Sequence, residues 1–588
     1  GNKDESTSSN VNENFSFDWL IHSSLRLNGR ISYTRNQNET TSFLSPNSVT
    51  YKDYGEGMSD VTTEDEILRG RYTYSQVKQD ALEGNLLVTW SRNIGKHFAT
   101  ASAGVSMSDS RSVVYGFTAQ GFGGNDASEP AYAEGYEEGG VPNNSEGHTR
   151  LASFFASANY AFDSRYLFDF SYRLDGSSQF GSAENVAPFY SIGLGWNVHN
   201  EAFIRKLNFV NVLKLRATYG ELGSISFSPY QAKDIYAATK NDRYDGNIGV
   251  VLQGLGNENL RWQTTKSYDF GLTLGLFDRF DFSLSFYKKE THDMVLPVTT
   301  PPSVGFDSFT ENLGRMRNTG YELSLRAFAI KKKTFNVSVF LNASHNKNKI
   351  LSISSALESY NKSIDNSEGK TENEYKQASH KFLTKYEEGQ STTAIYAVRS
   401  LGIDPMTGEE LFLTKEGKPT WIWNALDKIV VGDTEPKIRG TFGVNVGWKG
   451  LYMNATFAYQ YGGEAYNQTV VDKVENSNKY QNVDKRVLTE TWQKPGDVVK
   501  YKANVTSRLV QYFTYASSRF VQDLNYLQFS SFSLQYEMPK NWISCLRMES
   551  LRFSFNMSDL FYWSTVKRER GTSYPFARSF TVGLRANF

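Results

Sequence analysis

Apolar and polar side chains alternate along most of this chain, and this pattern restricts the fold more than any other feature of the sequence. In the stretch FARSFTVGLRANF (576–588), every second side chain from Phe580 onward is apolar. A period of two places apolar side chains on one face of an extended strand and polar side chains on the other. The pattern recurs in RYLFDFSYRLDG (165–176), SYDFGLTLGLF (267–277) and RFDFSLSF (279–286). We therefore expect a protein built from β-strands with one apolar face each.

The number and length of these segments suit a membrane. We count roughly 17 of them, mostly about 9–13 residues long, which is the length that a tilted strand needs to cross a bilayer. Aromatic residues make up 14% of the sequence, with 40 Phe and 35 Tyr. The mean hydropathy is nevertheless −0.50, and no apolar run reaches the roughly 18 residues of a membrane helix. Abundant apolar side chains that are spread one in two indicate a sheet.

The connections between the segments alternate between very short and very long. The short ones are 23–24, 93–96, 163–164, 277–279, 330–333 and 449–450, and the long ones are 37–80, 110–148, 222–263, 291–318, 348–436 and 462–521. Loops beyond about 12–15 residues are uncommon in compact soluble domains. Outer-membrane barrels, by contrast, have short periplasmic turns and long extracellular loops. The asymmetry favours a barrel over a soluble β-sandwich or propeller.

The predicted fold class is therefore all-β, a transmembrane antiparallel β-barrel. We expect residues 14–588 to form the barrel with its long extracellular loops, and residues 1–13 to be a polar extracellular loop segment. The strands at 14–22 and 579–588 then both run towards the periplasm. In the segment 165–176 we expect Tyr166, Phe168, Phe170 and Tyr172 to face lipid, and Arg165, Asp169 and Arg173 to face the lumen.

Aromatic residues near strand ends give two more expectations. Five tryptophans near strand ends suit an aromatic girdle at the lipid headgroups: Trp19, Trp90, Trp196, Trp448 and Trp563. The last strand, with Phe580, Val582, Leu584 and a terminal Phe588, is the expected assembly signal of the barrel.

Longer motifs then follow one another in a fixed order. They are RYLFDFSYRLDGSSQFG (165–181), PFYSIGLGWNVHNEAFI (188–204), LKLRATYGELGS (213–224), LRWQTTKSYDFGLTLGLF (260–277), NLGRMRNTGYELSL (312–325), AIYAVRSLGIDPMTGEELF (394–412), PKIRGTFGVNVGWKG (436–450), RVLTETWQKPGD (486–497), SSRFVQDLNYLQFSSFSLQYEMP (517–539), SLRFSFNMSDLFYW (550–563) and the final strand. In this order they resemble the SusC-type TonB-dependent outer-membrane transporters, over most of 14–588.

The resemblance implies a barrel of about 22 strands that imports glycans or peptides in a Gram-negative bacterium of the Bacteroidota type. It also implies a SusD-like surface lipoprotein as a lid, and TonB–ExbB–ExbD acting on an N-terminal plug domain. This sequence resembles the C-terminal barrel portion, with the plug absent. A first and a last strand that run the same way cannot pair antiparallel. We therefore expect a fragment of the same transporter, carrying the plug and the first strands, to pair with the edges at 14–22 and 579–588.

Other functional classes fit the sequence less well. A passive porin-like diffusion channel is the alternative to an active importer. An outer-membrane enzyme is disfavoured, because the chain has no HExxH, GxSxG or P-loop motif, so no catalytic residue and no cofactor are expected. The formal net charge is zero, so no excess of positive charge indicates binding to nucleic acid. The single cysteine, Cys545, excludes an intrachain disulfide framework.

Ligand contacts are expected in the long loops. The aromatic candidates lie between 113 and 140 and are Tyr115, Phe117, Phe122, Tyr132 and Tyr136. Such rings can contact the apolar faces of sugars or the side chains of peptides, although a self-packed loop or a contact with the lid would need the same residues. No metal site is predicted, because the seven histidines are scattered. Asp404 and Glu409, in the turn IDPMTGEE (403–410), are weak candidates for a cation.

Overall fold

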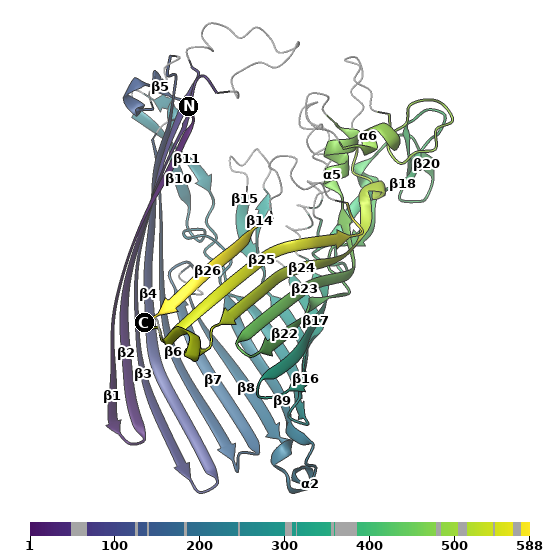
Figure 1. Ribbon diagram of the computed structural model, residues 1–588. Helices are drawn as coiled ribbons and strands as arrows, with labels where there is room; N and C mark the ends of the chain where they lie inside the picture. The colour runs from purple at the N-terminus through teal and green to yellow at the C-terminus, as the bar shows by residue number, and fades with distance from the viewer. Residues whose placement is uncertain are drawn as a thin grey trace.

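One large antiparallel sheet dominates the computed structural model of the chain (Figure 1). The structure describes residues 1–48, 68–123, 128–137, 140, 142–181, 185–244, 247–299, 308–312, 314–353, 358, 361, 385–477, 484–503, 514–544, 547–567 and 578–588. Cys545 lies outside these residues. Within them, no helix is both long enough and apolar enough to cross a membrane.

The sheet contains 18 strands, of which the short β5 (Gly135–Tyr136) only extends the pairing at the end of β4. The other 17 pair antiparallel in chain order, which confirms the predicted fold class and strand count. They are β1 (Lys3–His22), β2 (Leu25–Leu44), β3 (Arg71–Ile94), β4 (His97–Gln120), β6 (Asn143–Phe162), β7 (Tyr166–Ser177), β8 (Val186–Asn197), β9 (Val210–Ser224), β12 (Gln263–Leu276), β13 (Phe280–His292), β16 (Arg315–Lys331), β17 (Phe335–Ser352), β22 (Ile438–Trp448), β23 (Leu451–Tyr466), β24 (Val521–Glu537), β25 (Ser550–Ser564) and β26 (Phe580–Asn587).

Short connections lie at one end of the sheet, the turn side, and long ones at the other, the loop side (Figure 1). Several of the predicted turns take two consecutive residues through positive φ, such as Asp163 and Ser164 at 52° and 54°. Two such residues match the twist of the flanking strands, so the hairpin closes tightly. Two turn-side connections are longer than this, and they hold η3 (Val198–Asn200), α2 (Ala202–Arg205) and α7 (Lys540–Ile543).

The apolar side chains of neighbouring strands lie opposite one another and form one continuous surface, which we call the apolar face. Leu272 of β12 lies between Leu215 of β9 and Leu284 of β13, and Leu284 lies opposite Leu323 of β16. The strand register therefore carries the alternation seen in single segments across the whole sheet. In a membrane barrel this face meets lipid.

The apolar face is open rather than packed under another layer. On β7, the side chains of Tyr166, Phe168 and Phe170 are 49%, 41% and 37% exposed. The five tryptophans predicted for the girdle are exposed as well; four lie near the turn-side ends of β1, β3, β8 and β22, and Trp563 lies near the loop-side end of β25. No protein core covers these side chains in the described chain, which agrees with the prediction that they face lipid.

Fully buried apolar side chains gather instead on the loop side. The largest cluster includes Ile395, Val470, Val471, Val474 and Phe520, all 1% exposed or less. A second cluster packs Phe180 and Phe189 against Leu260 and Trp262. Packing of this kind means that the long connections contain ordered structure.

The long connections indeed form small sheets of their own. Within 222–263, β10 (Ile235–Tyr244) pairs with β11 (Asn247–Gly254), and within 291–318, β14 (Val295–Thr299) pairs with β15 (Ser308–Asn312). Within 348–436 lies a sheet in the order β20-β19-β18-β21. Its strands are β18 (Ala394–Ile403), β19 (Glu410–Leu413), β20 (Pro419–Thr420) and β21 (Lys428–Asp433). The period-two pattern does not indicate these strands, because most of them are short or, like β18 with its buried run Ala394–Val398, apolar on both faces.

The first strand begins earlier than the sequence predicts. Residues 1–13 were expected to be a loop segment, but β1 starts at Lys3 and pairs with β2 as far as Phe43. This expectation was wrong because the segment lacks apolar alternation, although its polar side chains pair across the hairpin. Asn10 Nδ2, for example, donates to Asn36 Oδ1 at 2.6 Å.

Each end strand of the sheet is paired on one side only among the described residues. β1 pairs with β2, and β26 pairs with β25. Both strands run from the loop side to the turn side, as expected for the strands at 14–22 and 579–588 (Figure 1).

We expect the apolar end of β26 to be needed for assembly. Phe588 is 79% exposed and follows the exposed Phe580, Val582 and Leu584 on the apolar face. Replacing Phe588 by Asp should reduce the heat-modifiable, folded protein in the membrane by about half or more, because a charge would stand on a face that meets lipid. Thr581→Asp, which places the charge on the opposite face of the same strand, is the matched control. Equal folded amounts of the two variants would contradict the assembly role.

Candidate ligand site on the loop side

Two long connections combine into one folded unit, which we call the loop-side domain. It contains the sheet of β18 to β21 and the described residues 467–477, 484–503 and 514–520, with α5 (Gln468–Val470), η7 (Val471–Glu475), α6 (Arg486–Thr489) and η8 (Ser518–Phe520). The first connection joins β17 to β22 and the second joins β23 to β24, so the domain stands above these strands (Figure 1). Burial of Ile395 and Phe520 in one cluster holds the two connections together.

A buried ion network lies at the junction of the two connections. Arg519 Nη2 donates to Glu410 Oε2 at 2.7 Å, and Arg519 Nη1 pairs with Glu475. The side chains of Arg519, Glu410 and Glu475 are only 9%, 6% and 0% exposed. Both carboxylates raise the pKa of Arg519 further above its usual range, against the effect of burial. Arg519 therefore keeps its positive charge, and Glu410 and Glu475 compensate that charge inside the protein.

The remaining carboxylate oxygens of the network are also satisfied. Ser517 Oγ donates to Glu410 Oε1 at 2.6 Å, and Thr514 Oγ1 donates to Glu475 Oε2 at 3.0 Å. The backbone N–H of Lys502 donates to Glu475 Oε1 at 3.1 Å. Because buried charges are stable only when they are paired and hydrogen-bonded, these contacts fix the positions of the segments around them.

A cavity of about 370 Å³ lies beside the network. Its lining contains four aromatic residues, four polar or charged residues, one glycine and one alanine: Thr407, Gly408, Glu409, Glu410, Phe412, Trp421, Trp492, Lys502, Ala503 and Tyr515. Trp492 is held by a hydrogen bond from Nε1 to the Pro405 carbonyl at 2.9 Å. Gly408 has φ +74° and would bring a Cβ within 2.6 Å of the Trp492 ring, so the wall requires glycine there.

The cavity offers both stacking and polar contacts to a ligand. Trp421, which lines the cavity, is 51% exposed. The carboxylates of Glu409 and Glu410 in the lining can accept hydrogen bonds. Burial lowers the pKa of Lys502 to about 8, although Glu475 and Glu410 oppose that change. The lysine is thus still mainly charged at pH 7. Aromatic rings beside donors and acceptors suit a sugar or a peptide.

The structure places the two weak cation candidates in different roles. The Asp404 carboxylate accepts hydrogen bonds from Thr407 Oγ1 at 2.7 Å and from the backbone N–H groups of Met406 and Thr407. The hydrogen bond from Thr407 is the main reason why the pKa of Asp404 is lowered. Asp404 therefore closes its own turn, while Glu409 lines the cavity. Among the described residues, no three His, Cys, Asp or Glu side chains form a group that could hold a metal ion.

The predicted aromatic contacts lie on β4 and the connection after it, apart from this cavity. The Phe117 ring stacks on Tyr74 at 5.5 Å and meets the edge of Tyr136 at 6.1 Å. The side chains of Tyr115, Tyr132 and Tyr136 are exposed by 47%, 60% and 50%, so a ligand contact stays a prediction for them. Phe122, by contrast, is 2% exposed and packs against Phe43 at 5.0 Å. The Phe122 ring therefore has no free surface for a ligand, and its role is to pack against Phe43.

The polar face of β7 pairs its charges internally. Arg173 Nε donates to Asp175 Oδ1 at 2.5 Å, two residues further along the same strand. Arg165 lies at the turn-side end and pairs with Asp163 and Glu201, both at 3.2 Å. Sequence reasoning could not foresee the second contact, because Glu201 belongs to the helical turn after β8.

Apart from Glu409, the residues that line the cavity are not among the candidates that the sequence offers. Trp421 and Trp492 stand in the unusual stretches TWIWN (420–424) and TETW (489–492), and clustered tryptophans in a polar loop were the one available signal. The cavity joins segments that are far apart in the chain, so no local spacing could bring Trp421, Trp492 and Tyr515 together.

Comparison with known proteins agrees with this architecture. The family model described as "TonB dependent receptor-like, beta-barrel" matches residues 1–403. The TonB-dependent receptor P3 of Formosa agariphila is 28% identical over 499 residues, which cover 77% of this chain and 47% of that protein. The TonB-dependent receptor SusC of Bacteroides thetaiotaomicron is 31% identical over 207 residues, 34% of this chain and 21% of that protein.

Solved structures share the fold. The RagAB peptide importer in its "open-open" state aligns with a TM-score of 0.80 at 23% identity and covers 100% of this chain and 62% of that chain. The chain spans about half the length of the Formosa relatives, 47% and 46% of two of them. The matches to SusC and to the Formosa receptors confirm the resemblance to SusC-type transporters. Since the family model matches more than half of its residues, this chain belongs to the family of TonB dependent receptor-like β-barrels.

Proposed function

We propose that this chain forms the membrane-crossing wall and part of the mouth of a SusC-type importer, which takes up glycans or peptides with energy delivered through TonB. The observation that carries the proposal is the loop-side domain. It holds an aromatic and polar cavity in place by a buried ion network, on the loop side of a sheet whose apolar face is open to lipid. We propose the outer membrane of a Gram-negative, Bacteroidota-type bacterium as its location, with many crossings of the bilayer, and we propose no catalytic role.

The same proposal assigns partners. A SusD-like lipoprotein lid on the loop side is the partner that the likeness to SusC-type transporters implies. TonB–ExbB–ExbD would act through a plug domain, and further strands of the same transporter would cover the outer edges of β1 and β26, because unpaired backbone groups in lipid cost several kcal/mol each.

A passive porin-like channel is the less favoured alternative. Uptake of labelled oligosaccharides and peptides by cells that make the intact transporter distinguishes the two. We expect uptake to stop when TonB is removed, whereas uptake that persists without TonB would mean a passive channel and overturn the proposal.

The role of the cavity has its own test. Trp421→Ala should weaken binding of the transported ligand to the purified transporter complex about threefold to tenfold, because one aromatic contact is worth about 0.5–1.5 kcal/mol. Trp563→Ala, which removes an exposed tryptophan from the apolar face, is the control and should bind normally. Isothermal calorimetry measures both, and equal affinities for the two variants would place the ligand elsewhere.

A further inference from the structure

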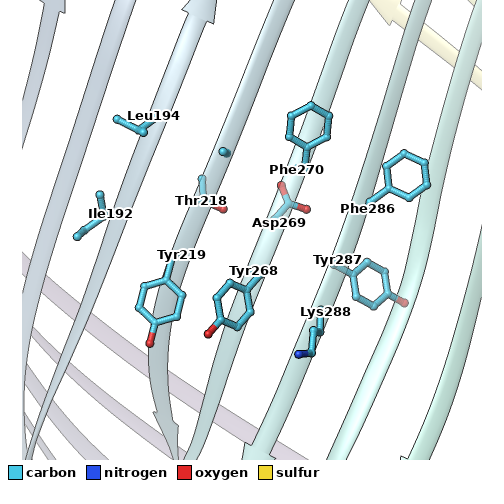
Figure 2. A pocket seen from close by; sticks show the side chains of 11 residues that line it. Ile192, Leu194, Thr218, Tyr219, Tyr268, Asp269, Phe270, Phe286, Tyr287 and Lys288 are labelled. Carbon is cyan, nitrogen blue, oxygen red and sulfur yellow. The ribbon is translucent and has the colours of Figure 1, made fainter.

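A row of tyrosines crosses the apolar face near its loop-side limit. The rings of Tyr190 and Tyr219 lie 6.0 Å apart, and those of Tyr219 and Tyr268 lie 4.9 Å apart. Lys288 Nζ lies 5.8 Å from the centre of the Tyr268 ring. In Figure 2 the hydroxyls of Tyr219 and Tyr268 and the amine of Lys288 point towards the same edge, the direction in which β9 and β13 run to the loop side. These groups mark a boundary between an apolar and a polar zone.

A hollow lies on the turn side of this row. It has a volume of about 580 Å³, and its apolar walls come from Ile192, Leu194, Phe270 and Phe286 (Figure 2). Its floor is Ala217, which lies opposite Leu194 on one side and Phe270 on the other. A methyl group between larger side chains leaves space on a face that otherwise carries Leu, Phe and Tyr. The shape suits an acyl chain.

Basic side chains occupy the same face on the loop side of the row. The set, which we call the basic cluster, is Lys266, Lys288, Arg317, Lys347 and Lys349. Arg317 lies opposite Glu290 on one strand and Lys349 on the next, and Thr319 lies between Lys288 and Lys347. Glu290 Oε1 accepts from both Lys288 at 3.0 Å and Arg317 at 2.8 Å. Within the described chain, Lys266, Lys347 and Lys349 make no ion pair.

This excess of positive charge is local. On β2 to β6, at the loop-side end of the apolar face, the charges are matched: Arg35 pairs with Asp80 at 2.6 Å and Arg111 with Glu146 at 2.7 Å. Across β9 to β17, the five cations of the basic cluster are accompanied by two carboxylates on the same face, Glu221 of β9 and Glu290 of β13, which lie on either side of Lys266. A surface that keeps unmatched cations beside a membrane boundary attracts anionic headgroups.

We propose that the hollow and the basic cluster together bind one phosphate-bearing lipid from the leaflet on the loop side. The acyl chain would lie over Ala217 between Leu194 and Phe270. The tyrosine hydroxyls would meet the headgroup, and Lys288, Arg317, Lys347 and Lys349 would hold its phosphates through charge-assisted hydrogen bonds. The apolar hollow, the amphipathic row and the cations follow one another in the order in which such a lipid presents its tail, its interface and its phosphates.

The test is native mass spectrometry of the intact transporter complex, delipidated in detergent and titrated with lipid A bearing two phosphates. The Lys347→Gln, Lys349→Gln double variant should bind roughly thirtyfold more weakly, because each basic residue near a membrane surface contributes about 1 kcal/mol to attraction of anionic lipid. The matched control is Lys332→Gln, Lys333→Gln, which removes two lysines from the turn between the same strands, β16 and β17, at the other side of the membrane. This control should bind like the parent.

Two further measurements test the phosphate contacts and the acyl-chain contacts separately. Dephosphorylated lipid A should bind weakly to the parent complex, and Ala217→Phe should reduce binding of the phosphorylated form by filling the hollow. The proposal is overturned if the parent complex retains no lipid, if dephosphorylated lipid binds equally well, or if the Lys332, Lys333 control loses as much binding as the Lys347, Lys349 variant. If only Ala217→Phe has no effect, the phosphates alone are recognised and the placement of the acyl chain is wrong.

Discussion

Replacing Glu475 by alanine should destabilise the loop-side domain by about 3–5 kcal/mol, because it would leave the buried charge of Arg519 with half of its compensation. The Glu475 side chain is fully buried and accepts hydrogen bonds from three groups, so none of these donors can turn to water instead. We expect the domain to open locally while the strands below it stay folded. Hydrogen exchange of the segment 467–520, compared with that of β22 and β23, measures this loss.

A surface ion pair in the same domain provides the control. Glu490 pairs with Lys500 at 3.5 Å, with exposed fractions of 34% and 76%, and exposed pairs contribute about 1 kcal/mol or less. Glu490→Ala should therefore leave the exchange rates near those of the parent. If Glu475→Ala also left the exchange rates unchanged, the network would not hold the two connections together, and the fixed geometry of the cavity would need another cause.

An arginine in place of Leu284 should cost the folded barrel about 2–4 kcal/mol, which is the range measured for Arg and Lys near the bilayer midplane. Leu284 lies on the apolar face between Phe282 and Phe286, midway between the turn at 277–279 and Lys288. The neighbouring residue Ser283 points to the opposite face of the strand. Ser283→Arg is therefore an internal control that differs by one position and should be tolerated.

Folding titrations in lipid vesicles, with the heat-modifiable gel shift as the readout, compare the two variants. A similar loss of stability for both would mean that the two faces of β13 meet the same environment. A larger loss for Ser283→Arg than for Leu284→Arg would reverse the assignment of the faces, and with it the lipid site inferred on the tyrosine row.

The sheet could be predicted from the sequence because its two determinants are local. Alternation within each segment fixes the faces, as in 279–286, and a short turn such as Lys449-Gly450 fixes which strands are neighbours. Polar strands escaped the pattern, as β1 shows from Lys3 to Glu13, because their pairing rests on backbone hydrogen bonds and side-chain amides rather than on an apolar face.

The candidate site could not be predicted in the same way. Its carboxylates and its arginine come from positions such as Glu410 and Arg519, and nothing in their neighbouring residues indicates that they are buried. The sequence offers Glu409 as a weak cation candidate, whereas the adjacent Glu410 is the residue that pairs with Arg519. Long-range contacts of this kind depend on how whole connections pack, which a single sequence does not encode at any fixed spacing.

The open apolar face also sets how freely the sequence can change during evolution. A side chain that meets fluid lipid needs to be apolar but has no fixed neighbour to fit, whereas a side chain in a close-packed cluster needs a particular shape as well. Positions such as Leu284, Leu323 and Val582 should therefore drift among Leu, Ile, Val and Phe in related chains. Val471, Val474 and Phe520, which are 0% exposed, should be restricted to one or two residue types although they lie in a long connection. In this protein, the loop-side domain rather than the membrane wall is the part where substitution is expected to be slow.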